Sequence, residues 1–187
     1  KQKQDLKNNL FKMPVQVRID DQIHTIWIED KELVYELPVD MRPKMVIFNA
    51  GMRIPCKVTF NKPVSEWILQ LEKGPHILDR IAAIRVLKTK KGRRSVETAL
   101  LNAARSDLFW GVRKEAVNAF ASLKSKKYAD EFMALAEGQD NRVRRAIWNG
   151  LKNYKDNEDV SLFLQNVIFS DNKYYSISDA FKSLVVV

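Results

Sequence analysis

A repeat of 32 residues runs through the second half of this 187-residue chain. Apolar residues recur at this spacing in two series, which are Leu100, Phe132 and Leu164 and then Ala104, Ala136 and Ile168. A second helical series lies between them, and its period varies between 30 and 33 residues. A two-helix unit of this length cannot bury its apolar face alone, so neighbouring units must stack. The repeat therefore predicts an α-solenoid of helix pairs.

Three aspartates recur where the second helical series begins, at Asp107, Asp140 and Asp171. A carboxylate at such a position can accept the free backbone N–H groups of a helix start, so each is predicted to be an N-cap. Small residues also recur and would let the stacked helices approach closely; they are Ala83, Ala116, Ala146, Gly150 and Ala180. The apolar segment 184–187 is interpreted as either a truncated or a closing repeat.

The chain has a different period before residue 63. Apolar and polar residues alternate in five short runs rich in β-branched and aromatic residues, at 15–19, 23–28, 33–37, 44–48 and 54–60. Such alternation indicates strands with one buried face, and five of them predict a small antiparallel β-sandwich that leans on a neighbour. The expected fold class is therefore α+β with several domains, a β-sandwich module over 1–62 and an α-helical solenoid over 63–187.

The helical region resembles HEAT-type repeats. The resemblance is carried by the pattern Asp-x-x-x-x-Val-Arg-x-x-Ala, which is clearest from Asp107 to Ala116, and it covers roughly residues 76–187. It implies two antiparallel helices per unit and a continuous core between units.

A second resemblance comes from the order of the segments and from the sequence that joins them. FKMPVQV (11–17) opens the strand region, PKMVIFN (43–49) closes its fourth strand, and KPVSEWILQL (62–71) leads into DRIAAIRVL (79–87). This arrangement is similar to the C-terminal half of zinc aminopeptidases of the M1 (gluzincin) family, in the bacterial branch whose last domain is HEAT-like. That family often has Asp where this chain has Asn49, in a predicted turn that Asn also suits.

The resemblance implies a function for a larger parent protein. The chain would be its non-catalytic C-terminal accessory region, which shapes access to a catalytic cleft in an N-terminal part; its partners would be that catalytic domain and the peptide substrates. The alternative is a binding scaffold, either a catalytically dead M1 relative or a helical-repeat protein that binds nucleic acid. The expected compartment is the bacterial cytoplasm or periplasm, with no membrane partner.

The sequence predicts no catalytic residue, no cofactor site and no metal site in this chain; zinc belongs to the parent if the resemblance holds. The gluzincin motif His-Glu-x-x-His needs two histidines four residues apart, whereas His24 and His76 are 52 residues apart. His24 is expected to face outward on its strand and His76 to cap a helix or face solvent. Cys56 is expected to be a packed thiol, and as a single cysteine it excludes an internal disulfide. No stretch is apolar over the roughly 18 residues that a membrane helix needs.

Basic residues form three clusters, in keeping with a net charge of +9. We expect the clusters in loops within repeats, where stacking would join them into one basic ridge; its residues are Lys88, Lys90, Lys91, Arg93, Arg94, Lys124, Lys126, Lys127, Lys152 and Lys155. A second basic line, Arg80, Arg113, Arg144 and Arg145, is expected on the first helices of the repeats. The ridge is interpreted as solvated loops or a docking edge, with nucleic-acid phosphate as the less favoured alternative.

Overall fold

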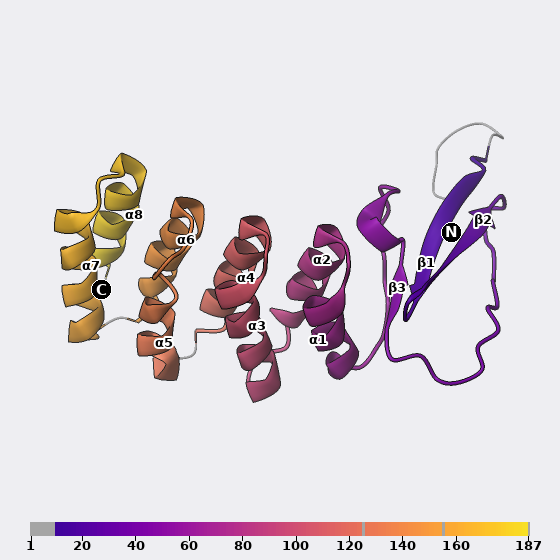
Figure 1. Ribbon diagram of the computed structural model, residues 1–187, viewed down its shortest axis with the longest axis horizontal. Coiled ribbons are helices and arrows are strands. Elements are labelled where there is room, and N and C mark those ends of the chain that lie inside the picture. Colours follow the sequence, from indigo (N-terminus) through magenta and orange to yellow (C-terminus); the bar gives the residue numbers. More distant parts are fainter. Residues whose placement is uncertain (1–9, 125, 155, 187) are drawn as a thin grey trace.

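The computed structural model describes residues 10–124, 126–154 and 156–186. Figure 1 shows a small sheet at one end, followed by a single row of helix pairs that extends away from it. The architecture is thus a three-stranded antiparallel sheet joined to a helical repeat region.

The sheet has the strand order β2-β1-β3, with β1 (Met13–Ile19) in the centre, β2 (Gln22–Ile28) and β3 (Val46–Phe48). Strands β1 and β2 form a hairpin, in which Val17 lies opposite His24. Its tight turn places Asp20 in the left-handed region, with φ of 47°. Val15, Val17 and Ile26 are buried on one face, which confirms the predicted alternation in these strands.

The prediction of five strands is wrong for two of them, because 33–37 and 54–60 form no strand. In the first segment Val34 is 89% exposed, so apolar composition there does not reflect burial. In the second, Pro55 has no N–H to give to a ladder. The predicted sandwich is therefore a single three-stranded sheet with irregular segments beside it.

Asn49 makes the turn that ends the sheet, as the sequence predicts. Its backbone is left-handed, with φ of 54°. Its side chain accepts the N–H of Ile54 at 3.1 Å and donates to the carbonyl of Ile54 at 2.6 Å. These two bonds satisfy the backbone of Ile54 as a neighbouring strand would, which explains why the chain stays irregular here.

Eight α-helices follow in the described part of the chain. They are α1 (Val64–Lys73), α2 (Ile77–Leu87), α3 (Arg94–Ser106), α4 (Trp110–Ser122), α5 (Ala129–Ala134), α6 (Asn141–Leu151), α7 (Glu158–Ser170) and α8 (Tyr174–Leu184). Consecutive helices pack as the pairs α1–α2, α3–α4, α5–α6 and α7–α8. Successive pairs then stack through α2 on α4, α4 on α6 and α6 on α8. This confirms the predicted solenoid.

The repeat positions form the core of this stack. Leu100, Phe132 and Leu164 each have no exposed surface, so the 32-residue series does mark the buried face. The small residues also act as predicted. At Gly150 an added Cβ would lie 2.6 Å from the Phe132 ring and 3.0 Å from the Ala121 Cβ, so α6 can approach α5 only without a side chain there.

The last pair shows what stacking contributes. Phe181 on α8 occupies the repeat position that Ile84, Val117 and Trp148 hold on α2, α4 and α6. Those three residues are at most 2% exposed, whereas Phe181 is 57% exposed. The difference follows from position, since a subsequent pair covers each of the first three and none of the described residues covers Phe181.

Candidate interaction surface

The predicted basic ridge lies in loops that connect successive pairs, not in loops within a pair. Segment 88–93 joins α2 to α3, segment 123–128 joins α4 to α5, and segment 152–157 joins α6 to α7. The prediction was wrong because periodicity identifies helices but does not tell which neighbours pair. The loops still share an edge, because α2, α4 and α6 stack on one another and end on the same side (Figure 1).

The ridge side chains that the structure describes are exposed; they are Lys88, Lys90, Lys91, Arg93, Arg94, Lys124, Lys127 and Lys152. Lys127 forms an ion pair with Glu97 at 3.0 Å and lies over the Tyr128 ring. Hydrogen bonds to Glu97 and Tyr128 raise the pKa of the Lys127 ammonium. Lys155 and the side chain of Lys126 lie outside the described residues.

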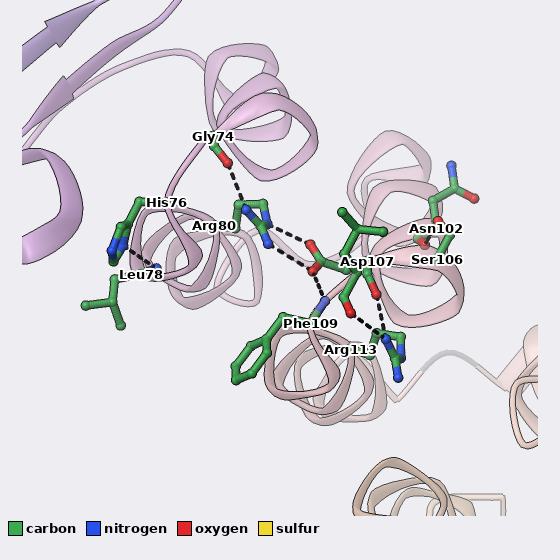
Figure 2. A network of polar contacts seen from close by, with 10 residues as sticks. Gly74, His76, Leu78, Arg80, Asn102, Ser106, Asp107, Phe109 and Arg113 are labelled. Carbon is green, nitrogen blue, oxygen red and sulfur yellow. Dashed lines mark hydrogen bonds and ion pairs between the residues drawn. The ribbon is translucent and has the colours of Figure 1, made fainter. Parts of the chain in front are cut away.

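The second basic line lies inside the stack and is largely neutralised. It occupies second helices of the pairs, contrary to the prediction. Arg80 on α2 donates from Nε and Nη2 to the two carboxylate oxygens of Asp107, at 2.7 and 3.0 Å, and from Nη1 to the Gly74 carbonyl at 3.0 Å. Figure 2 shows this guanidinium held between the α1–α2 turn and the α3–α4 turn. Arg80 therefore fastens the first pair to the second.

The same Asp107 carboxylate also organises the start of α4. Its Oδ1 accepts the N–H of Phe109 at 2.9 Å, and its carbonyl accepts from Arg113 at 2.7 Å (Figure 2). The Nε of Arg113 also donates to Gln139 Oε1 at 2.8 Å, which links α4 of the second pair to the α5–α6 turn of the third. The sequence also offered Glu115, Asp130 and Asp140 as acidic neighbours for these arginines, but none of the three pairs with Arg80, Arg113, Arg144 or Arg145. Glu115 instead lies 3.8 Å from Arg85, and Asp140 pairs with Arg142.

The arginine contacts between successive pairs are here called the ladder. At the last pair the ladder consists of two arginines of α6. Arg144 lies 3.4 Å from Asp171, and Arg145 donates to Asp179 at 2.6 Å. Burial opposes ionisation of Asp171, but hydrogen bonds from Ser176 and the Lys173 N–H outweigh it, and the pKa of this carboxyl is lowered. Ile177 on α8 stands at the repeat position of Arg144, so α8 carries no arginine of this ladder.

The three recurrent aspartates are helix-start residues, although only one is the N-cap itself. Asp140 caps α6 by accepting the N–H of Arg142 at 2.8 Å, and hydrogen bonds from Arg142 lower the pKa of its carboxyl. Asp107 and Asp171 precede the N-caps by two residues and accept the N–H two positions on. All three thus satisfy a free donor near a helix start, as the sequence predicts.

A buried polar network joins the sheet to the first helix pair. The Lys62 side chain is only 2% exposed; it donates to the Val46 carbonyl at 2.9 Å and to Gln70 Oε1 at 2.7 Å, and it lies over the Trp67 ring at 4.2 Å. The N–H of Val46 in turn donates to Glu66 Oε1 at 2.9 Å. Burial lowers the pKa of the Lys62 ammonium, against the attraction of Glu66. The sheet and the helical stack are therefore fixed to each other.

Asp79 on α2 completes this network. We call the contacts of Lys62, Glu66, Gln70 and Asp79 with the sheet and the segment that follows it the seam. It is 2% exposed, and its Oδ1 accepts the N–H of Gly51 at 2.7 Å, while Gln70 donates to its carbonyl at 2.7 Å. A cavity of about 240 Å³ lies alongside, lined by Asn49, Cys56, Trp67, Asp79 and Arg85 among others. Sequence reasoning missed these contacts, although the apolar stretch 67–71, interrupted by Gln70 alone, was one signal of them.

The histidines and the cysteine form no reactive group with other described residues. His24 is half-buried on the same strand face as Ile26, so the expectation that it faces outward is wrong. His76 caps α2 through Nδ1, which accepts the N–H of Leu78 at 3.2 Å, as predicted (Figure 2). Cys56 is exposed rather than packed, with Sγ 3.3 Å from Asn49 Nδ2.

Within 10–124, 126–154 and 156–186, no three His, Cys, Asp or Glu residues are grouped so that they could hold a metal ion. No helix in these ranges is both long enough and apolar enough to cross a bilayer.

Comparison with known families supports the repeat assignment. A family model described as HEAT repeats matches residues 96–180. This match spans α3 to α8 almost completely, and the helical region is therefore HEAT-like. No curated protein matches the chain.

Proposed function

We propose that this chain is the non-catalytic C-terminal accessory region of an M1-type zinc aminopeptidase. In such a protein the sheet links the catalytic part to the helical stack, and the stack restricts which peptides reach the catalytic cleft. The chain contributes shape and charge to this task and no reacting group.

The observation that carries the proposal is the seam between the sheet and α1–α2. Three of the four segments that resemble the M1 family meet there; they are 43–49, 62–71 and 79–87. Val46 bonds to Glu66, Lys62 bonds to Val46, and Asp79 bonds to Gly51 next to the first of these segments. These segments are far apart in the sequence but hydrogen-bond to one another in the fold. Their resemblance therefore supports a shared architecture better than it would if they lay apart.

The described residues do not fit zinc themselves. His24 lies on a strand and His76 uses Nδ1 to cap a helix, and neither belongs to a group of three ligands among the described residues. Under the proposal, zinc and the glutamate that activates water belong to the parent's catalytic part, which carries His-Glu-x-x-His.

The first test uses the chain alone and the reading frame upstream of Lys1. We expect the purified chain, with and without added zinc, to hydrolyse no aminoacyl p-nitroanilide above the buffer rate, and we expect an intact His-Glu-x-x-His upstream. Turnover by the chain would contradict a non-catalytic role. An upstream motif with a ligand or the glutamate replaced would instead favour the catalytically dead scaffold.

A further inference from the structure

The two basic lines of the chain differ in what neutralises them. Arg80, Arg144 and Arg145 each pair with a carboxylate inside the stack. By contrast, no ion pair with a described acidic residue involves any of the ridge residues Lys88, Lys90, Lys91, Arg93, Arg94, Lys124 and Lys152. Seven exposed cations with no ion-pair partner among the described residues therefore lie along one edge.

Helix ends explain part of this edge but not all of it. Lys88 and Lys152 are the C-caps of α2 and α6, and Lys124 directly follows the C-cap of α4, where a cation opposes the helix macrodipole. The group Lys90, Lys91, Arg93 and Arg94 has no such role, since it lies beyond the end of α2 and at the start of α3. A cation at a helix start is unfavourable, so this group needs another explanation.

The shape of the α2–α3 loop presents the group to solvent. Gly92 turns the chain with φ of 72°, and no atom lies within 4 Å of where its Cβ would be. All four flanking cations are exposed. The loop is thus a projecting basic turn at the sheet-proximal end of an edge that Lys124 and Lys152 extend toward the other end of the stack.

The edge has the cations of an anion-binding surface without the apolar anchors of a protein interface. Specific protein interfaces have a dry core of large apolar side chains. No described residue of segments 88–94, 123–128 and 152–157 is an exposed large hydrophobic; Tyr154 is buried and Leu123 and Tyr128 pack on the core. A nucleic-acid backbone needs only such cations, and it is read without sequence preference.

We infer that this edge binds the phosphate backbone of duplex nucleic acid, with Lys90, Lys91, Arg93 and Arg94 as its main contacts. The activity is separate from the proposed aminopeptidase role, and it uses a different face from the seam. Binding is sequence-independent and strongly weakened by salt.

The test is fluorescence anisotropy of the whole chain with a labelled DNA duplex of about 30 base pairs at about 50 mM salt and above. Replacing Lys90, Lys91, Arg93 and Arg94 with Glu should weaken binding by about tenfold or more. It should also reduce the slope of log affinity against log salt by about three to four, as expected for four lost phosphate contacts.

The control replaces four exposed cations of the sheet region, Lys31, Arg42, Lys44 and Lys57, with Glu. Both variants have the same net charge, so only the position of the charges differs. The inference requires the control to bind within about threefold of the unmodified chain. Equal losses in both variants would show non-specific attraction, and no binding by the unmodified chain at low salt would remove the inference. Circular dichroism of each variant confirms that it is folded.

Discussion

Replacing Phe132 with Ala is expected to lower the free energy of unfolding by about 3–5 kcal/mol, the range for truncating a buried aromatic residue. The ring has no exposed surface and lies between the rings of Phe120 and Tyr154, with centroids 5.7 and 5.9 Å away. It also fills the space that Gly150 leaves open on α6. Removing it leaves a cavity where two successive pairs meet, so the loss includes the contacts between them. Urea unfolding followed by circular dichroism measures the change.

Phe169 supplies the matched control, because the same side chain on α7 is 88% exposed. Phe169→Ala should change the free energy of unfolding by less than about 0.5 kcal/mol, the usual range for a surface position. Similar losses for both variants would contradict the view that the 32-residue series marks the core. A loss at Phe132 confined to a separate, earlier transition would show that the pairs unfold independently.

Replacing Asp107 with Ala is expected to destabilise the chain by about 3 kcal/mol, because it breaks a largely buried ion pair from one side. The Arg80 and Asp107 side chains are only 14% and 8% exposed. The substitution would leave the Arg80 guanidinium with the Gly74 carbonyl alone, and it would also free the N–H of Phe109. The effect should appear in the same urea unfolding experiment.

Asp140 is the control for this prediction, since it also accepts a backbone N–H at a helix start but forms its ion pair at the surface of the stack. Its carboxylate pairs with Arg142, which is 51% exposed, and caps α6. Asp140→Ala should therefore cost only the cap, about 1 kcal/mol. If the two substitutions lower the free energy of unfolding equally, the ion pair of Arg80 with Asp107 contributes nothing beyond capping. The ladder between pairs then does not stabilise the stack.

The helical half of the fold could be predicted from the sequence because its period is set by burial. Leu100, Phe132 and Leu164 recur every 32 residues, and a strict period survives only where the same packing contact is repeated. Which helices pair could not be predicted, since the period of apolar residues marks the buried face of each helix but not which neighbour covers it. The basic clusters were therefore predicted in loops within pairs, whereas they lie in loops between pairs. The prediction that these loops share one edge of the stack is confirmed.

The sheet region was predicted less well, for reasons visible in two segments. The run 33–37 has the composition of a strand, but a strand also needs a partner, and composition does not report one. Near Ile54 the Asn49 side chain replaces the partner strand, a local competition that alternation patterns cannot reveal. The seam at Lys62 and Asp79 depends on contacts between residues far apart in sequence, so no local pattern predicted it.

The most direct test of the accessory role uses the parent protein shortened to end after Gly92, which keeps the seam and the α1–α2 pair. We expect kcat/KM for a long peptide, relative to kcat/KM for a small aminoacyl reporter, to rise by about tenfold when the rest of the stack is removed. The reporter itself should be cleaved at an unchanged rate, because under the proposal the stack supplies no reacting group. A ratio that stays the same in the shortened protein would contradict the proposal that this region controls access to the cleft.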